Sequence, residues 1–191
     1  EGIMSKYPTL KIGFYSSKTP MSEKKLHFSN VDEYWSCYDV LIYTPTVSAG
    51  ISFEKPHYDK LYAYFTDNSC HAEVCIQMIG RIRNVKSKNY VVCIDSTRRN
   101  LPVDVGVIRN ALMDSRSNLF KEMGEAPLEF EYDANGKVKF YENDYFHVWL
   151  ENTRIKNLSK NNFIQRFIHL ISSVGPKIIK LSVKADLDQL N

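Results

Sequence analysis

A strand–helix–strand pattern over residues 61–95 is the feature that most limits what this chain can fold into. Residues 61–65 are apolar and aromatic and precede a polar run, which predicts a buried strand leading into a helix capped by Asn68 or Ser69. Residues 90–95 form a second apolar run. Two buried strands joined by a helix are typical of a parallel sheet, so the sequence predicts an α/β fold.

The helix predicted between these strands has two different sides. Its apolar side should pack on the sheet and consists of Val74, Cys75, Met78, Ile79 and Ile82. Gln77 and Arg81 are four residues apart, so they are expected on the other side, facing a ligand or a cleft. Gly80 is a poor helix former, which close approach of another backbone or of a phosphate would explain. Arg83 could join Arg81 on one anion if the helix frays near Asn84.

Two arginines and an amide suit a polyphosphate. For the two arginines alone, a solvated helix end with basic residues that offset the helix dipole is the better explanation. A second motif favours the anion, because residues 44–53 place the hydroxyl residues Thr44, Thr46 and Ser48 and a glycine, Gly50, directly after a predicted strand at 40–43. Hydroxyl and backbone N–H groups can converge on an anion at that edge of a sheet.

A further strand is predicted at residues 10–15 and a short helix at residues 31–35. The polar residues that follow this strand are Ser16, Ser17 and Lys18. They lie at the edge where open α/β sheets bind ligands, so they could hold a phosphate. Hydroxyl-rich loops are as often simple turns, and both interpretations stay open.

Composition describes an ordinary globular protein with one substantial core, since 43% of the 191 residues are hydrophobic and 13% aromatic. The net charge of +3 is too small to prove a nucleic-acid partner. No apolar run could span a bilayer and no signal-peptide pattern is present, so no membrane partner is expected. Cys37, Cys70, Cys75 and Cys93 are predicted to be reduced core thiols in an intracellular compartment. Because Cys70, His71 and Cys75 match no common zinc spacing, no metal site is expected.

The two motifs together resemble the second RecA-like domain of superfamily 2 helicases. Residues 44–52 resemble motif V, usually Thr, small residues and then Gly-Ile-Asp, and residues 77–83 resemble motif VI, usually Gln-x-x-Gly-Arg-x-x-Arg. The greatest similarity is to the origin-binding, replicative helicases of herpesviruses and related helicases of large DNA viruses, which share the form Thr-Pro-Thr-x-x-x-Gly-x-Ser-Phe and the shortened ending Gln-x-x-Gly-Arg-x-Arg. The resemblance covers roughly residues 10–96.

The resemblance assigns the first motif to nucleic acid and to the junction with the nucleotide. It implies that Thr44 grips the phosphate backbone, with Thr46 and Ser48 as weaker candidates. Gly50 would let the backbone approach where the two sites meet. Ser52 stands where many relatives have an Asp that faces the nucleotide ribose.

The second motif is assigned to ATP by the same resemblance. Gln77, Arg81 and Arg83 would face the ATP phosphates across an interdomain cleft, and Gly80 would lie beside them. Arg83 in the first place, and Arg81 in the second, would be the arginine finger that neutralises charge on the γ-phosphate. The second arginine comes one residue earlier than in the usual motif.

A phosphate-binding loop of the form Gly-x-x-x-x-Gly-Lys-Ser/Thr is missing from the sequence. By resemblance, that loop and an acidic pair for Mg²⁺ belong to a first RecA-like domain that would lie before Glu1. ATP and Mg²⁺ are therefore expected to be bound mainly by that N-terminal domain, which would be a partner of this chain. The chain starts without Met and is expected to be a fragment with no ATPase activity of its own.

The expected function is that of the C-terminal motor half of an ATP-dependent DNA helicase or translocase, active in replication. Its partners would be DNA, as a single strand or fork, and replication proteins, in the nucleus or cytoplasm of the host cell if the protein is viral. The alternative is a non-catalytic nucleic-acid-binding or scaffold module that keeps the RecA-like fold.

Two domains are expected: residues 1–100 as the second RecA-like domain, a mostly parallel sheet with flanking helices truncated at its N-terminus, and residues 101–191 as a C-terminal extension. The extension should hold a helix over 103–123, a hairpin over 128–141, and two helices after residue 145 separated by 157–162. Cross-strand charge pairs are predicted in the hairpin between Glu129 and Glu131 on one strand and Lys137 and Lys139 on the other. Arg98 and Arg99 with Lys86 and Lys88 are predicted to form a local basic cluster that could follow a phosphate backbone, or only form a solvated surface. The same two interpretations apply to Arg154, Lys156, Lys160 and Arg166 of the C-terminal helices.

Overall fold

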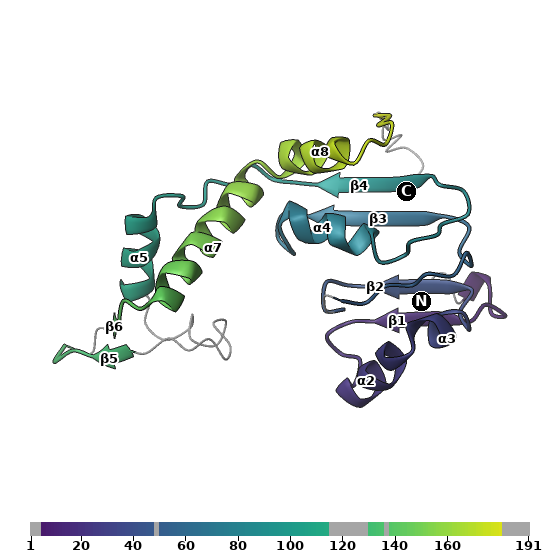
Figure 1. Cartoon of the computed structure of the whole chain (residues 1–191), viewed down its shortest axis with the longest axis horizontal. Coiled ribbons are helices and arrows are strands. Elements are labelled where there is room, and N and C mark those ends of the chain that lie inside the picture. The colour runs from purple at the N-terminus through teal and green to yellow at the C-terminus, as the bar shows by residue number, and fades with distance from the viewer. Residues whose placement is uncertain (1–4, 48–49, 115–129, 136–137, 181–191) are drawn as a thin grey trace.

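Four parallel strands form the main layer of the protein. The computed structural model describes residues 5–47, 50–114, 130–135 and 138–180. The strands are β1 (Ile12–Tyr15), β2 (Val40–Tyr43), β3 (Leu61–Thr66) and β4 (Tyr90–Asp95), and all four run in the same direction (Figure 1). Backbone hydrogen bonds join them as two separate pairs, β1 with β2 and β3 with β4. The prediction of a mixed α/β chain with parallel pairing is confirmed. A continuous sheet is not formed by the described residues, because no ladder joins β2 to β3.

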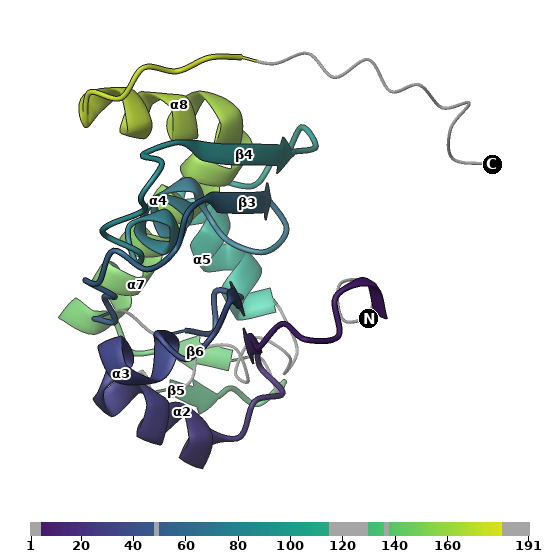
Figure 2. The ribbon, with the colours of Figure 1, turned by 90° about the vertical axis from the view of Figure 1, so that its right-hand side faces the viewer.

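Helices cover one side of this strand layer. The connections from β1 to β2 and from β3 to β4 contain α2 (Met21–Ser29), α3 (Val31–Trp35) and α4 (Ala72–Ile79). They lie on the same side of the strands (Figure 2). Sequence reasoning predicted α3 with its observed bounds but missed α2, whose Met21 and Leu26 are exposed while Lys24 is buried. A helix with that distribution has no apolar stripe to detect.

The core beneath α3 is aromatic and centres on Trp35, whose side chain is fully buried. Its ring centroid lies 5.9 Å from those of Tyr15 and Tyr43 and 6.2 Å from that of Phe53. The Tyr58 hydroxyl donates to the Trp35 carbonyl at 2.7 Å. This cluster therefore ties the ends of β1 and β2 to the loop that carries Phe53.

Helix α4 is shorter than predicted at both ends. Its N-cap is His71 in extended conformation without a side-chain cap bond, so neither Asn68 nor Ser69 caps it. Cys75 and Met78 are buried, which confirms the apolar side. The helix ends at Ile79, so the predicted helical run through residue 83 is wrong. The N–H and C=O groups of residues 81–83 take part in an extended bridge instead, which competes with further helical turns.

The C-terminal part of the described chain holds two helices, α7 (Asp144–Asn161) and α8 (Phe163–Ser173), and α8 completes a second hydrophobic core. The predicted polar separator at 157–162 is wrong in extent, because α7 continues through residue 161 and the break is at Asn162. Phe163 and Phe167 of α8 pack in the same cluster as Phe65 and Met78. Figure 1 shows α8 lying along β4, and α8 also contacts α4. The C-terminal segment thus shares a core with the strand–helix–strand unit.

The remaining elements are α5 (Val105–Asp114), which lies beside α7, and the hairpin of β5 (Phe130–Tyr132) and β6 (Val138–Phe140). The start of the helix predicted over 103–123 is confirmed, and residues 115–123 lie outside the described residues. The antiparallel hairpin is confirmed, with Glu131 opposite Lys139 and their charged atoms 3.4 Å apart. The other predicted pair, Glu129 and Lys137, also lies outside the described residues. The division at residue 100 stays a prediction.

Glu73, in the first turn of α4, is the polar contact that holds α7 and α8 to this helix. Its carboxylate accepts from Ser159 Oγ at 2.7 Å and from Arg166 Nε at 2.7 Å, and it lies 2.9 Å from His71 Nδ1. Burial raises the pKa of Glu73, but the hydrogen bonds from Ser159, His71 and Arg166 outweigh it and lower that pKa from 4.5 to about 2. The folded protein therefore favours the ionised carboxylate.

We expect Glu73→Gln to lower the free energy of unfolding at pH 7 by about 1–3 kcal/mol, because a partly buried carboxylate with charged donors is lost. The folded pKa lies below the unfolded one, so the contribution is present above about pH 5 and disappears as the pH falls towards 2. Denaturant unfolding of both proteins between pH 7 and pH 3 measures this.

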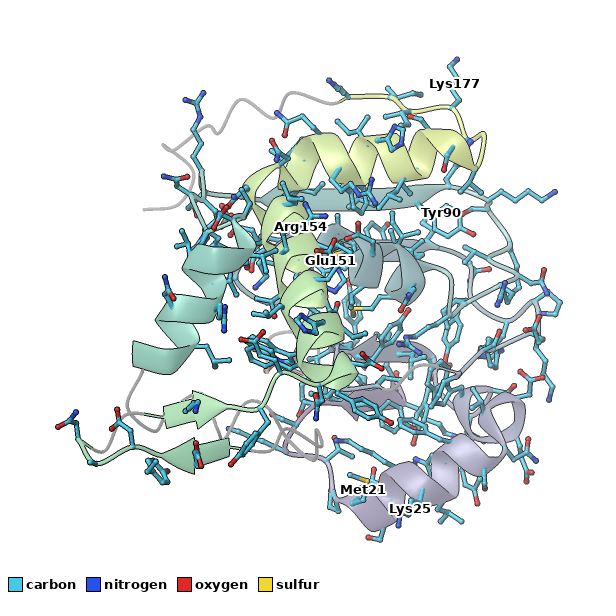
Figure 3. The ribbon with its side chains drawn as sticks, turned by 60° about the vertical axis from the view of Figure 1, so that its left-hand side comes forward. Met21, Lys25, Tyr90, Glu151, Arg154 and Lys177 are labelled. Carbon is cyan, nitrogen blue, oxygen red and sulfur yellow. The ribbon has the colours of Figure 1, made fainter. Side chains whose placement is uncertain are left out.

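The matched control is Glu151→Gln. Glu151 and Arg154 lie side by side on the surface of α7 (Figure 3), with Arg154 Nε donating to Glu151 at 2.8 Å. Exposed pairs of this kind contribute little to stability. Equal losses in the two variants, or a Glu73→Gln effect that is as large at pH 3 as at pH 7, would contradict the role of Glu73.

Candidate functional site

The two predicted motifs meet at a backbone bridge between Phe53 and Ile82. The Phe53 N–H donates to the Arg81 carbonyl at 2.7 Å, and the Arg83 N–H donates to the Phe53 carbonyl at 3.0 Å. Both bridging side chains are buried. The loop that follows β2 and the segment that follows α4 are therefore fixed to each other, although nearly thirty residues separate them.

Arg83 is the exposed member of this junction. Its Nε donates to Ser52 Oγ at 3.0 Å and lies 3.9 Å from Glu54 Oε1, and its side chain is 61% exposed. The structure thus brings together Ser52 and Arg83, which the sequence placed on the nucleotide side of the site. The Ser52 hydroxyl donates to Glu54. The guanidinium is held on one side by neutral and acidic oxygens and is open to solvent on the rest.

Glu54 is a member of this site that sequence reasoning missed. Its backbone N–H donates to Asp32 Oδ1 at 2.8 Å, and its carbonyl accepts from the Asn84 side chain. The sequence offered only a weak signal, an acidic residue two positions after Ser52. Asp32, at the start of α3, supports the loop through the hydrogen bond to the Glu54 N–H.

Arg81 has a different environment from Arg83. It is 6% exposed, and burial lowers the pKa of its guanidinium while nearby Tyr43 raises it. Burial in turn raises the pKa of Tyr43 to about 12, and the Tyr43 hydroxyl donates to the Met78 carbonyl at 2.8 Å. The prediction that a frayed helix brings both guanidiniums to one exposed anion is not met in this structure, because one arginine is interior and the other faces solvent.

The remaining residues of the second motif lie at the end of α4. Gln77 is exposed on the helix, as expected for a ligand-facing residue. Gly80 has ordinary right-handed helical backbone with φ of −71°. A Cβ placed on it would come no closer than 3.6 Å to any heavy atom, so no described part of the chain explains this glycine by close approach.

The loops after β1 and β2 lie at one edge because these neighbouring strands are parallel. The Thr44 N–H donates to the Tyr15 carbonyl at 3.0 Å, and the Thr44 and Thr46 hydroxyls are 2.8 Å apart. Thr46 is exposed and Thr44 half-buried. Ser48 lies outside the described residues, and Gly50 has a φ of +89°, which favours glycine.

The loop after β1 is organised by its own hydrogen bonds. Ser16 is buried, its N–H donates to Thr19 Oγ1 at 3.0 Å, and its hydroxyl accepts from the Lys18 N–H at 3.2 Å. These bonds account for a polar turn. Ser17 and Lys18 remain exposed beside the Thr44 loop, so only their side chains are open to a phosphate.

Asp67 is a second acidic residue that sequence reasoning missed. It follows β3, is 1% exposed, and accepts from Ser96 Oγ and Thr97 Oγ1 at 3.3 Å each. Arg99 Nε lies 3.4 Å from its carboxylate. A signal was present in the sequence, since parallel strands 61–65 and 90–95 must end at the same edge. Asp67 anchors the chain that leaves β4.

The expected basic cluster of Lys86, Lys88, Arg98 and Arg99 is not a single cluster. The two lysines precede β4 and the two arginines follow it, so a strand about 20 Å long separates them. Lys86 lies 3.1 Å from Asp59, and Arg99 is engaged by Asp67. In α7 and α8, Arg154 and Arg166 pair with Glu151 and Glu73, which favours the interpretation of a solvated surface.

The cysteines divide into two kinds. Cys70 and Cys75 are buried with their sulfur atoms 3.3 Å apart, whereas Cys37 and Cys93 are exposed. The prediction of four core thiols is therefore wrong for two of them, since Cys37 follows a short helix and Cys93 lies on the uncovered face of β4. The hydrogen bond between the buried thiols lowers the pKa of Cys70 and raises that of Cys75. His71 pairs with Glu73, and no group of three metal-ligating side chains occurs in the described part of the chain.

Comparison with known proteins shows the family. The family described as "Origin of replication binding protein" matches residues 21–124, more than half of the chain. The chain belongs to this family. The expected resemblance to proteins of herpesviruses and other large DNA viruses is thereby confirmed, while the assignment to superfamily 2 and its second RecA-like domain remains an expectation. No solved structure matches the chain.

Relatives of this family member come from several large DNA viruses. The "Putative helicase/primase complex protein" of African swine fever virus (isolate Pig/Kenya/KEN-50/1950) is 42% identical over 181 residues, which cover 94% of this chain and 17% of that protein. The "Putative replication origin-binding protein" of Acanthamoeba polyphaga mimivirus is 29% identical over 91% of this chain and 23% of that protein. The "Replication origin-binding protein" of human herpesvirus 2 is 28% identical over 53% of this chain and 11% of that protein.

The chain spans about a sixth of the length of the African swine fever virus relatives. The long, apolar helix that a membrane span would require is not found among the described residues.

The two glycines of the site should respond in opposite ways to alanine. We expect Gly80→Ala to raise the free energy of unfolding by up to about 1 kcal/mol, because its backbone is helical and a methyl group has room. Gly50→Ala should lower it by about 1–2 kcal/mol, because φ is +89°. Urea unfolding of the 191-residue chain measures both. A loss of stability in Gly80→Ala would reveal a close contact at this glycine.

Proposed function

We propose that this chain is the C-terminal motor half of an ATP-dependent DNA helicase or translocase that acts in viral replication. The observation that carries the proposal is the junction of the two motifs, in which the Phe53–Ile82 bridge and the Ser52–Arg83 hydrogen bond present an arginine to solvent. The names of relatives support the replication role, since they include a helicase/primase complex protein and replication origin-binding proteins. DNA and other replication proteins would be the partners.

Arg83 is assigned as the arginine finger. Its ties are a hydrogen bond to Ser52 and a 3.9 Å approach to Glu54, both at an exposed position, and pairs of this kind contribute at most about 1 kcal/mol. A triphosphate held by a neighbouring domain offers a more strongly charged partner. The guanidinium can therefore move from Glu54 to the γ-phosphate oxygens and neutralise charge that develops in the transition state.

Arg81 is assigned a positioning role. Because its side chain is buried near Tyr43, it fixes the segment that carries Arg83 rather than reaching a separate domain. Gln77, exposed on α4, and the exposed Gly80 beside it complete the surface that would face the nucleotide.

The residues of this site that could contact ATP held by another domain are the exposed ones. Ser52 and Arg83 supply donors to phosphate oxygens, whereas the described residues offer no three-ligand group for a metal ion. Mg²⁺ would be held, with most of the nucleotide, by the domain outside this chain. When bound there, it would neutralise phosphate charge alongside Arg83.

Thr44 and Thr46 are assigned to the DNA backbone. Their hydroxyls lie together at the edge where β1 and β2 end, next to Ser17 and Lys18. Hydroxyl and lysine donors of this kind grip phosphates without reading sequence. Because the Thr44 loop continues into Ser52 and Phe53, a change in the grip of Arg83 on a phosphate would be transmitted to the DNA contacts.

The second candidate function is a non-catalytic nucleic-acid-binding or scaffold module with a RecA-like fold. It is favoured by Ser52, which stands where an Asp is usual, and by the early position of Arg83. The two functions differ in whether the intact protein uses Arg83 for turnover.

We expect Arg83→Ala in the intact parent protein to lower DNA-stimulated ATP turnover by about 10³–10⁵-fold, because an arginine finger contributes that much. Binding of a non-hydrolysable ATP analogue and of single-stranded DNA should be retained. Arg154→Ala, which removes a partly exposed arginine of α7 that pairs with Glu151, is the control and should leave turnover unchanged. Normal turnover in Arg83→Ala, or none in the parent, would favour the module.

We expect the 191-residue chain alone to hydrolyse no ATP above background, with or without DNA, because it has no phosphate-binding loop. A steady-state phosphate-release assay measures this, with the parent protein as the positive control. DNA-stimulated turnover by the chain alone, abolished in its own Arg83→Ala variant, would show that the nucleotide site lies within these residues.

A further inference from the structure

An apolar cavity lies between the two strand pairs. Its volume is about 650 Å³, and it is lined on one side by residues of β2, on the other by residues of β3, and beneath by the end of α4. Leu41, Tyr43, Leu61, Phe65 and Met78 are among its walls. The charged members of its lining, Asp39 and Lys60, directly precede β2 and β3 and stand at one end. Along the rest of its length the cavity offers no charged side chain that could bind a nucleic acid or a charged peptide.

The strands on either side of this cavity turn unpaired backbone edges towards it. On β2, the Val40 N–H donates to Lys11 and the Thr44 N–H donates to Tyr15, both on the side of β1. In a parallel pair, alternate residues point their donors to the same neighbour, so the N–H groups of Leu41 and Tyr43 point away from β1. No backbone ladder joins β2 to β3 in the described part of the chain. Backbone N–H groups that face an apolar cavity require partners.

We propose that a further β-strand of the same polypeptide, from outside these 191 residues, fills the cavity, runs parallel to β2 and β3, and hydrogen-bonds to both. It would turn the two pairs into one five-stranded parallel sheet. With four to six residues in each neighbouring strand, its paired stretch is about five residues long. Because the cavity walls are apolar, both faces of the added strand would be buried, and its sequence should be a continuous run of apolar residues.

The relatives contain additional polypeptide from which such a strand could come. The African swine fever virus protein matches 94% of this chain with only 17% of its own length, so most of that protein lies outside the match. A parallel strand cannot be supplied by a hairpin from β2 or β3 and requires a crossover connection of a dozen or more residues.

The other face of the sheet shows where that crossover lies. Large apolar side chains are exposed on all four strands of the face turned away from α3 and α4, namely Phe14, Ile42, Tyr62, Tyr64 and Val91. Their neighbours Tyr15, Leu41 and Ala63 pack in the core on the helix side. A parallel sheet usually has helices on both faces. A parallel sheet with helices on one apolar face and none on the other is therefore unusual.

Handedness connects these two observations. The connections from β1 to β2 and from β3 to β4 advance across the sheet in one direction and lie on one side (Figure 2). We place the added strand before β1 in the polypeptide, so the chain must cross the sheet in the opposite direction to reach β1. Since such connections are right-handed, its crossover lies on the opposite face. One added strand with its connection thus fills the cavity and covers the exposed tyrosines.

Amide hydrogen exchange in the intact parent protein tests the strand. We expect Leu41 and Tyr43 to exchange at rates within about tenfold of Ile42 and Thr44, whose donors face β1, because all four would be in a sheet interior. In the 191-residue chain alone, Leu41 and Tyr43 should exchange at least about tenfold faster than Ile42 and Thr44. Fast exchange of Leu41 and Tyr43 in the parent would overturn the proposal.

The source of the protection is tested by dilution and by DNA. A strand of the same polypeptide gives protection that is independent of protein concentration and present without DNA. Protection that grows with concentration would assign the cavity to a second copy, and protection that requires single-stranded DNA would assign it to nucleic acid. Either result would overturn the proposal. These outcomes are independent of ATP turnover, so they do not depend on the proposed function.

Tyr62→Lys tests the crossover on the exposed face. The 191-residue chain should tolerate it without a change in Tm, because Tyr62 is 68% exposed there. The parent should unfold at lower temperature, because the lysine would be buried without a partner. Tyr145→Lys is the control, since Tyr145 is 63% exposed on α7 and should be tolerated in both. Equal tolerance of the two variants in the parent would contradict the covering of this face.

Discussion

The backbone bridge between Phe53 and Ile82 is the constraint on which the candidate site depends. It stops α4 at Ile79, since the donors and acceptors of the next residues are directed to Phe53 rather than to the preceding turn. It also sets the two arginines in different environments. Phe53 is held in turn by the ring of Trp35, so the aromatic core of the first strand pair determines where Arg83 meets solvent.

Helix α4 is held from its other end by the C-terminal helices. Glu73 binds Ser159 of α7 and Arg166 of α8, and the aromatic rings of α8 pack beside Phe65. The segment after residue 100 is therefore not a loose appendage, because it supplies part of the core on which α4 rests. The C-terminal helices hold the start of α4, and the bridge to Phe53 holds the segment after its end. The position of the residues that follow α4 is therefore fixed from both sides.

The features that could be predicted from the sequence are those that a local pattern of residues determines. Strands β1 to β4 were found because each is an apolar run between polar residues, and the loops at their carboxyl ends followed from parallel pairing. The end of α4 was misplaced because Ile82 continues the helical spacing, although it is buried by its pairing with Phe53. Glu54 and Asp67 were missed because their arginine partners lie about thirty residues further along the chain, so the pairing of elements and not local spacing brings them together. The contact between Ser52 and Arg83 likewise required the fold.

The two arginines of the second motif differ in burial, and this difference decides which of them can bind a ligand. A guanidinium buried near Tyr43 is already part of the core. A guanidinium that is 61% exposed and tied by one hydrogen bond to a serine can exchange that bond for a phosphate oxygen at little cost. Only the second arrangement serves a group that must act on a ligand carried by another domain. In the proposed function, one arginine of this short motif positions the segment and the other binds the nucleotide.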